Sequence, residues 1–179
     1  CAKAQSVIFT KAMDAYKKGE FEAARTYLGQ ELEEHPDNGG AYLYLALIEK
    51  IAGNYSAALK NANLTIKYYP KPKDKEDYAY LYEVKGDAYY GLAQYESAIT
   101  EYTTALKYKR TYTDLYLSRG RCYYNLGKYT EAIADFQMAL TDNEVDPNPL
   151  NWIASSFIRQ EKYDEALQYV EKAIAFDET

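Results

Sequence analysis

Histidine and cysteine are scarce in this sequence, and each scarcity excludes a class of site. The 179 residues include a single histidine, His35, and two cysteines, Cys1 and Cys122. A metal site built from several histidines is therefore excluded, and so is a small scaffold held together by disulfides. Five prolines and nine glycines exclude a collagen-like or proline-rich chain.

Positive charge and long apolar runs are also in short supply. Lysine and arginine number 21 against 27 aspartates and glutamates, which gives a net charge of −6. Nucleic acid is therefore not expected as a partner, because binding phosphates requires a basic surface. The longest apolar run, residues 41–48, is too short to cross a bilayer, so no transmembrane helix is expected.

Tyrosine, by contrast, is abundant. There are 22 tyrosines, and aromatic residues make up 16% of the chain. Hydrophobic residues at 47% and charged residues at 27% are close to the averages of globular proteins. A folded chain is therefore expected rather than a disordered one.

The first residues suggest that the protein is exported. Ala2-Lys3-Ala4 has the small-x-small pattern of a signal-peptidase site. In a second interpretation, Cys1 is the lipidated first residue of a bacterial lipoprotein. We therefore expect an exported protein that is periplasmic or lipid-anchored at Cys1. The alternative is that residue 1 is an arbitrary boundary of the sequence and that the protein is cytoplasmic.

One pattern recurs five times along the chain. A small residue is followed twelve positions later by alanine, and an aromatic residue stands three positions before that alanine. Successive copies are 34, 40, 34 and 34 residues apart. The small residues are Ala12, Ala46, Gly86, Gly120 and Ala154; the alanines are Ala24, Ala58, Ala98, Ala132 and Ala166; the aromatics are Phe21, Tyr55, Tyr95, Tyr129 and Tyr163.

Each copy predicts two helices, which we name A and B. In the fourth copy, Tyr116, Gly120 and Tyr123 recur at helical spacing, and Gly127 ends the first helix before a second apolar pattern begins. The small residue and the alanine allow helices A and B to approach closely. The aromatic residue after the turn is expected to fill the closed end of this hairpin.

The pattern resembles the tetratricopeptide repeat (TPR), a 34-residue helix-turn-helix unit. The resemblance implies an all-α fold: a right-handed superhelix of five repeats, about ten helices, over residues 5–179. The repeats lie near residues 5–38, 39–72, 79–112, 113–146 and 147–179, after a leader or linker at 1–4. An insertion falls near 73–78, where Asp74 is expected to cap an early-starting helix A of the third repeat.

Members of this family bind peptides on the concave face formed by the A helices. Carried over by repeat position, the resemblance implies a peptide-binding face on this chain. Tyr16, Tyr90 and Tyr124 share one repeat position and predict a ladder of tyrosines. The predicted face consists of Met13, Tyr16, Lys17, Leu43, Tyr44, Leu47, Tyr80, Glu83, Asp87, Tyr90, Leu117, Arg121, Tyr124 and Trp152.

Other kinds of site are not indicated. Phe9 and Met13 replace the Lys and Asn with which chaperone-binding members grip a C-terminal carboxylate, so a chaperone adaptor is disfavoured. His35 is expected in a loop, and Cys122 in the core. No catalytic residues, metal or cofactor are predicted.

The sequence therefore predicts a protein–protein interaction scaffold without catalysis, whose partner is an unknown protein or peptide. The alternative is the recognition module of a larger exported enzyme or of a secretion or assembly complex. The final helix carries Leu167, Val170, Ala173, Ile174 and Phe176, and its own repeat can cover only part of that set. We expect weak self-association through this C-terminal helix, or a further segment of chain that covers it.

Overall fold

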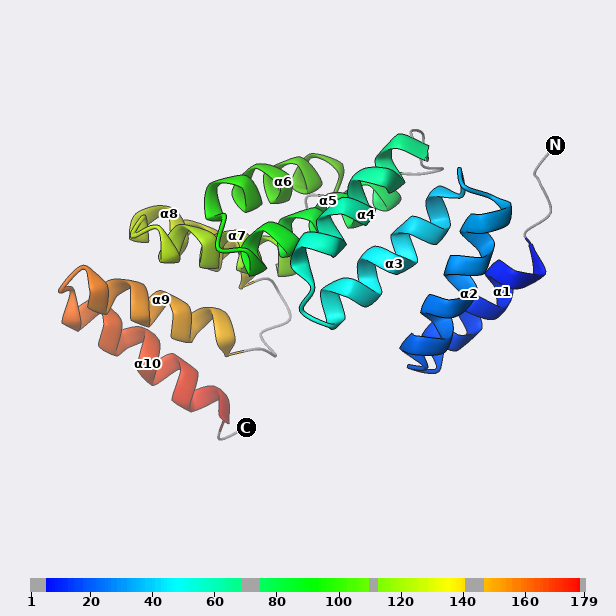
Figure 1. The fold of residues 1–179 in the computed structure, drawn as a ribbon. Coiled ribbons are helices and arrows are strands. Elements are labelled where there is room, and N and C mark those ends of the chain that lie inside the picture. Colours follow the sequence, from blue (N-terminus) through cyan, green and yellow to red (C-terminus); the bar gives the residue numbers. More distant parts are fainter. Residues whose placement is uncertain (1–5, 69–74, 110–112, 141–146, 178–179) are drawn as a thin grey trace. The chain divides into compact units, whose positions relative to one another are not determined.

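The computed structural model describes residues 6–68, 75–109, 113–140 and 147–177. The described residues form ten α-helices and no strand (Figure 1). The all-α class and the five helix-turn-helix repeats predicted from the sequence are therefore confirmed. Cys1, the leader at residues 1–4 and Asp74 lie outside the described residues.

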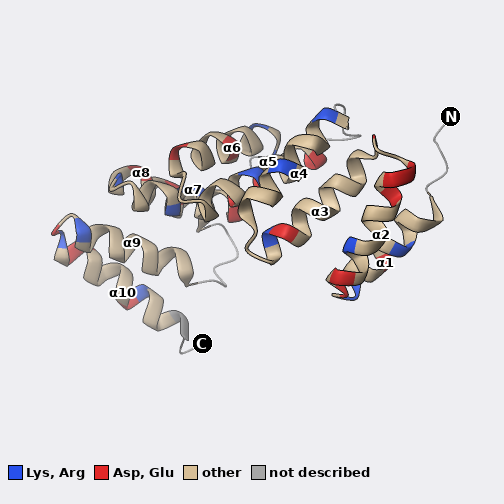
Figure 2. Ribbon diagram, viewed as in Figure 1, with Lys and Arg blue, Asp and Glu red and all other residues tan. Residues whose placement is uncertain are grey.

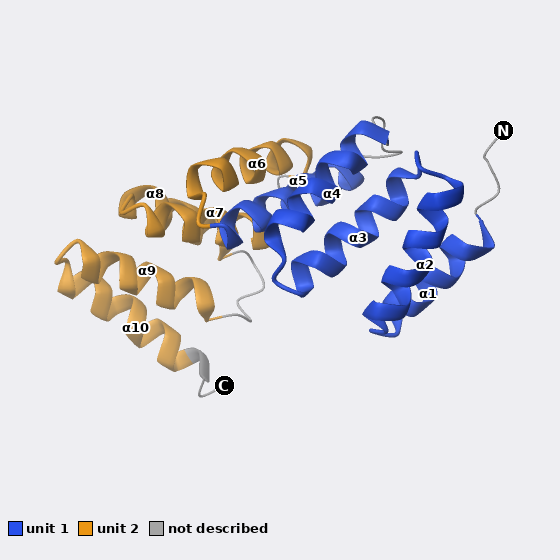
Figure 3. Ribbon diagram, viewed as in Figure 1, with its two compact units in different colours: residues 1–92 blue, residues 93–179 orange. Residues whose placement is uncertain are grey.

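The chain divides into two compact units, residues 1–92 and 93–179 (Figure 3). Unit 1 holds α1 (Val7–Lys17), α2 (Phe21–Glu34), α3 (Gly39–Ile51), α4 (Tyr55–Tyr68) and α5 (Lys75–Gly91). Unit 2 holds α6 (Tyr95–Tyr108), α7 (Thr113–Asn125), α8 (Tyr129–Ala139), α9 (Asn148–Arg159) and α10 (Tyr163–Asp177). Within each unit, consecutive helices pack against each other, so that every A helix whose preceding B helix lies in the same unit contacts that helix.

In the first, second, fourth and fifth repeats, the recurring small residues belong to A and B helices that pack against each other. All ten recurring small residues are buried, and Ala24, Ala58 and Ala98 have no exposed surface. A Cβ atom added to Gly120 would lie 2.6 Å from the Phe136 ring, closer than atoms can approach. The prediction of a close A–B contact is therefore confirmed.

The turn between helices A and B has the same backbone conformation in each repeat. Gly19, Gly53 and Gly127 have φ between 73° and 76°, in the left-handed region that glycine tolerates best. At the equivalent turns, Ala93 has φ 56° and Glu161 has φ 60°. Ala93 and Glu161 therefore hold a side chain in a conformation that disfavours side chains.

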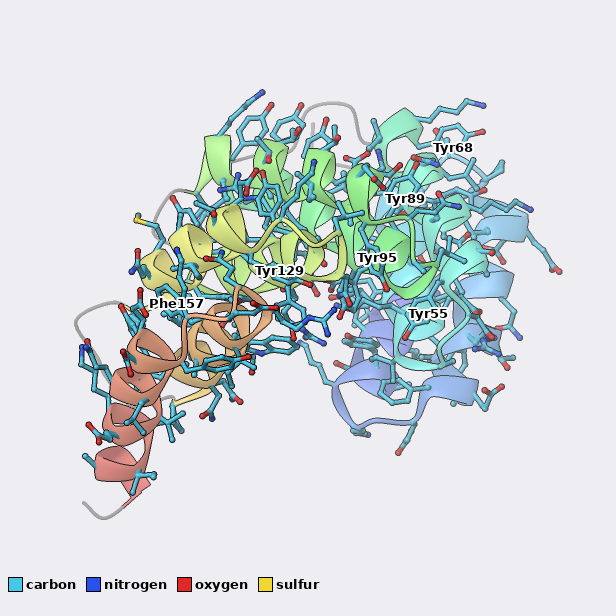
Figure 4. The ribbon with its side chains drawn as sticks, turned by 90° about the vertical axis from the view of Figure 1, so that its left-hand side faces the viewer. Tyr55, Tyr68, Tyr89, Tyr95, Tyr129 and Phe157 are labelled. Atoms are coloured by element: carbon cyan, nitrogen blue, oxygen red, sulfur yellow. The ribbon has the colours of Figure 1, made fainter. Side chains whose placement is uncertain are left out.

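The turn aromatics are half-buried in four repeats and exposed in the fifth. Phe21, Tyr55, Tyr95 and Tyr129 are half-buried, and Tyr55 lies against Gly91 of the next A helix (Figure 4). Tyr163 is 65% exposed. The expectation that it fills a hairpin end is therefore wrong, because no A helix follows α10 among the described residues.

The insertion lengthens one helix. Helix α5 begins at Lys75 and has 17 residues, whereas α3 and α7 each have 13. The prediction that helix A of the third repeat starts early is confirmed. Helix α5 therefore offers an additional turn compared with the other A helices.

Candidate functional site

The predicted binding residues all lie on A helices, and we describe those of each unit separately. In unit 1 they come from α1, α3 and α5, and in unit 2 from α7 and α9. Most are half-buried, while Lys17 and Tyr80 are exposed. Leu47 differs, because it is only 5% exposed and packs with Ala46 and Val84 in the core. It therefore supports the face from beneath and offers little surface to a partner.

In unit 1, Tyr16 of α1 and Tyr44 of α3 form a cluster with the turn residue Phe21 and the buried Phe9. We call this cluster the unit 1 patch: Phe9, Tyr16, Phe21 and Tyr44. The rings of Tyr16 and Tyr44 are 5.1 Å apart and meet edge to face. Phe9 contacts Tyr44 at 5.8 Å, and Phe21 contacts Tyr16 at 5.7 Å. Edge-to-face contacts fix ring orientation, so the patch is pre-organised.

An ion pair borders the unit 1 patch. The ammonium of Lys50 on α3 lies 2.8 Å from a carboxylate oxygen of Asp87 on α5. Burial lowers the pKa of Lys50, but the nearby carboxylates of Asp87 and Glu83 outweigh this and raise the pKa above its usual value. Lys50 occupies the repeat position of Tyr16 and Tyr90. The predicted tyrosine ladder is therefore interrupted by a charged side chain in unit 1.

Tyr44 is held in its neutral form. Burial, followed by the proximity of Tyr16, raises the pKa of Tyr44 above its usual value. The pKa of this hydroxyl therefore lies further above physiological pH than that of an exposed tyrosine.

In unit 2, aromatic rings and guanidinium groups alternate in a cluster here called the unit 2 patch: Arg121, Tyr124, Tyr129, Trp152 and Arg159. Tyr124 meets Trp152 edge to face at 5.2 Å and Tyr129 at 5.4 Å. The guanidinium of Arg121 lies over Trp152, 5.6 Å from the ring centre. Arg159 donates a hydrogen bond from its Nε to the Tyr129 hydroxyl over 3.0 Å. Apolar ring faces and cationic donors therefore share one surface.

The sequence prediction missed the turn aromatics as members of these patches. Phe21 follows Tyr16 by five residues, and Tyr129 follows Tyr124 by the same interval. Both pairs are in ring contact. The shared spacing was visible in the sequence, but only the folded turn shows that it returns the second ring to the end of helix A.

Polar groups outside the patches serve the fold. Asp135 is 6% exposed and accepts two hydrogen bonds of 2.7 Å from Arg119, which also donates to Thr103. Cys122 is buried, as predicted, and His35 is half-buried at the end of α2. No cluster of three or more potential metal-ligating residues occurs in the described part of the chain. Within that part, no helix is both long and apolar enough to span a membrane.

Sequence comparison identifies the family. Tetratricopeptide repeat models match residues 9–71, 84–149 and 148–179. The chain belongs to the tetratricopeptide repeat family. Its fold supports a role as a protein-interaction scaffold. Among curated proteins, none matches the chain in sequence.

Solved TPR structures resemble the chain over nearly its whole length. A crystal structure of the MamA protein has a TM-score of 0.85 at 20% identity and covers 96% of this chain and 91% of its own. MamA from Desulfovibrio magneticus RS-1, residue 41 to the end, has a TM-score of 0.87 at 14% identity, with coverages of 96% and 94%. A thermophilic TPR protein of Thermus thermophilus, TTC0263, has a TM-score of 0.64 at 25% identity, with coverages of 94% and 89%.

Proposed function

We propose that this TPR protein binds extended segments of other proteins on the A helices of each unit, at the aromatic patch of that unit. The observation that carries the proposal is the unit 2 patch, where Trp152, Tyr124 and two arginines lie together and remain partly exposed. Tryptophan, tyrosine and arginine are the residues most enriched at the energetic centres of protein interfaces. No step of this proposal requires catalysis.

The chemistry of the patches favours a segment that carries both apolar and acidic side chains. Ring faces around Trp152 and Tyr44 offer apolar area with little rotamer freedom to lose. Arg159, which is exposed, can share its guanidinium donors between the Tyr129 hydroxyl and a carboxylate or backbone carbonyl of the segment.

A peptide-display selection against the purified chain tests the proposal without a known partner. Enriched peptides are titrated while the fluorescence of Trp152 is followed, which is specific because it is the only tryptophan. We expect the peptides to change this emission, and Tyr124→Ala and Tyr90→Ala each to weaken binding by about 1–3 kcal/mol.

Two controls separate binding from folding. Tyr124→Phe keeps the ring contacts and is expected to bind nearly as well as the original chain. Tyr108→Ala removes an exposed tyrosine from a B helix and should leave binding unchanged. Unchanged binding in Tyr124→Ala together with a collapsed melting temperature would show that Tyr124 belongs only to the core.

A further inference from the structure

The outer face of the final helix, α10, is apolar and uncovered. Tyr163, Leu167 and Ile174 are 65%, 56% and 54% exposed. Their counterparts in the fourth repeat, Tyr129, Ile133 and Leu140, are at least half-buried. In that repeat the A helix of the next repeat packs on the B helix, so α10 displays a surface of the kind that elsewhere receives an A helix.

The first helix, α1, displays the complementary surface. Val7, Lys11, Asp14 and Lys18 are all exposed, and Val7 is 72% exposed. The residues at the same repeat positions in the fifth repeat, Pro149, Ile153, Ser156 and Gln160, are buried or half-buried. This face of an A helix is therefore the one that packs on the preceding B helix, and α1 has no such helix among the described residues.

Contacts inside the chain show how the two faces would align. Between an A helix and the preceding B helix, Arg119 donates to Thr103 over 3.0 Å, Arg159 donates to Tyr129 over 3.0 Å, and Gln160 lies 3.5 Å from Thr130. In these contacts the end of an A helix lies beside the start of the preceding B helix, and the middles of the two helices lie together, so the two helices are antiparallel. The contacts supply a register that can be transferred to α10 and α1.

Transferred by repeat position, each of these contacts becomes a pair of complementary residues. The pair Arg119–Thr103 becomes Lys11 with Glu171. The pair Gln160–Thr130 becomes Lys18 with Asp164, and Arg159–Tyr129 becomes Lys17 with Tyr163.

The same register also matches apolar residues. Ile66 packs in unit 1 against the cluster that contains Leu81. Transferred by repeat position, the pair Ile66–Leu81 becomes Ile174 with Val7. These two residues are 54% and 72% exposed.

We propose that the chain associates head to tail, with α1 of one copy packed on α10 of a second copy as a continuation of the repeat stack. Lys11 of α1 and its C-cap Lys18 then face two carboxylates of α10, and apolar residues meet beyond them. Figure 2 colours the charged residues of the helices by sign. Asp14 is the acidic residue on the α1 face, and Lys172 on α10 lies over the Tyr169 ring of its own helix. The interface is heterologous, so further copies can add at either end.

Light scattering of the purified chain over a concentration series tests this inference. We expect the weight-average mass to rise with concentration and the rise to diminish at high salt. Lys11→Glu with Lys18→Glu makes both faces acidic, and Asp164→Lys with Glu171→Lys makes both basic. Each double variant alone is expected to associate at least about tenfold more weakly, because like charges then oppose each other.

Mixing the two double variants provides the decisive measurement. An equimolar mixture pairs every acidic face with a basic one, so association is expected to return. Lys60→Glu with Lys107→Glu is the matched control, since it makes the same charge change at exposed positions away from α1 and α10. Circular dichroism of each variant checks that it remains helical.

Three results would overturn the proposal. The first is a chain that stays monomeric at every concentration, even if a different protein binds its α10. The second is equal weakening in the Lys60/Lys107 control. The third is a mixture that does not recover association, which would show that the charges of α1 and α10 do not face each other across the interface.

Discussion

Units 1 and 2 share one repeat pattern but stabilise their helices through different buried polar groups. In unit 1, Glu31 is 1% exposed and accepts hydrogen bonds from Ser6 and from Asn38, the residues that cap α1 and α3. In unit 2, Asp135 binds Arg119 in a bidentate ion pair. One carboxylate therefore holds neutral caps, and the other holds a cation. Both carboxylates are buried, but their partners differ in charge. Removing each carboxylate should therefore change the free energy of unfolding by a different amount.

The largest expected effect comes from removing the carboxylate of unit 2. Asp135→Ala leaves Arg119 largely buried without its counter-charge, and we expect the free energy of unfolding to fall by about 3–5 kcal/mol. Glu31→Ala leaves only neutral donors, and we expect a fall of about 1.5–3 kcal/mol.

Urea unfolding distinguishes these two variants by region. Trp152 fluorescence reports on unit 2, while far-UV circular dichroism reports on all helices. We expect Asp135→Ala to shift the fluorescence transition more than Glu31→Ala does. Equal shifts for the two variants would mean that the chain unfolds as one cooperative block and that the contrast between the units has no energetic content.

A smaller effect is expected at the glycines within helices. Gly120→Ala in unit 2 places a Cβ against Phe136 and should cost about 1–3 kcal/mol through overpacking. Gly29→Ala in unit 1 is the matched control, because its Cβ would meet nothing within 4 Å. That variant should gain about 0.5–1 kcal/mol, since alanine favours the helix more than glycine does. The melting temperatures of both variants test whether the close approach of α7 and α8 excludes a side chain at position 120.

The turns offer a still smaller contrast. Ala93→Gly and Glu161→Gly remove a side chain from the left-handed conformation, and each should stabilise the chain by about 0.5–1 kcal/mol after the greater flexibility of glycine is included. The reverse change in unit 1, Gly53→Ala, should destabilise by a similar amount. A loss of stability in both glycine variants would contradict the claim that the left-handed conformation of Ala93 and Glu161 is unfavourable.

The smallest effect concerns alkaline pH and unit 1. The pKa values of Tyr44 and Lys50 are both raised, so the folded chain holds these protons more tightly than the unfolded chain does. Their contribution is fully present below the unfolded pKa values, about 10 for tyrosine and 10.4 for lysine, and is lost as the pH rises through the folded ones. We expect Tyr44→Phe to reduce the pH dependence of the free energy of unfolding in this alkaline range, measured by denaturant titration.

The sequence by itself determined the repeats and their helices. Small residues, alanines and aromatics at fixed spacing were sufficient, because two helices in close contact require small side chains at the crossing whatever surrounds them. The long α5, the buried Cys122 and the uncovered Leu167 and Ile174 followed from the same spacing. All of these depend on contacts within one repeat or on the absence of a helix after α10 among the described residues.

Only the tertiary structure decided how neighbouring repeats pair their side chains. Leu47 was predicted on the binding face but is buried, and Tyr163 was predicted in a hairpin end but is exposed. The buried pairs of Asp135 and Glu31 were not predicted from a pattern that treats charged residues as solvated. Whether a side chain is buried, paired or open depends on the helix that packs beside it, and spacing along one chain does not contain that information.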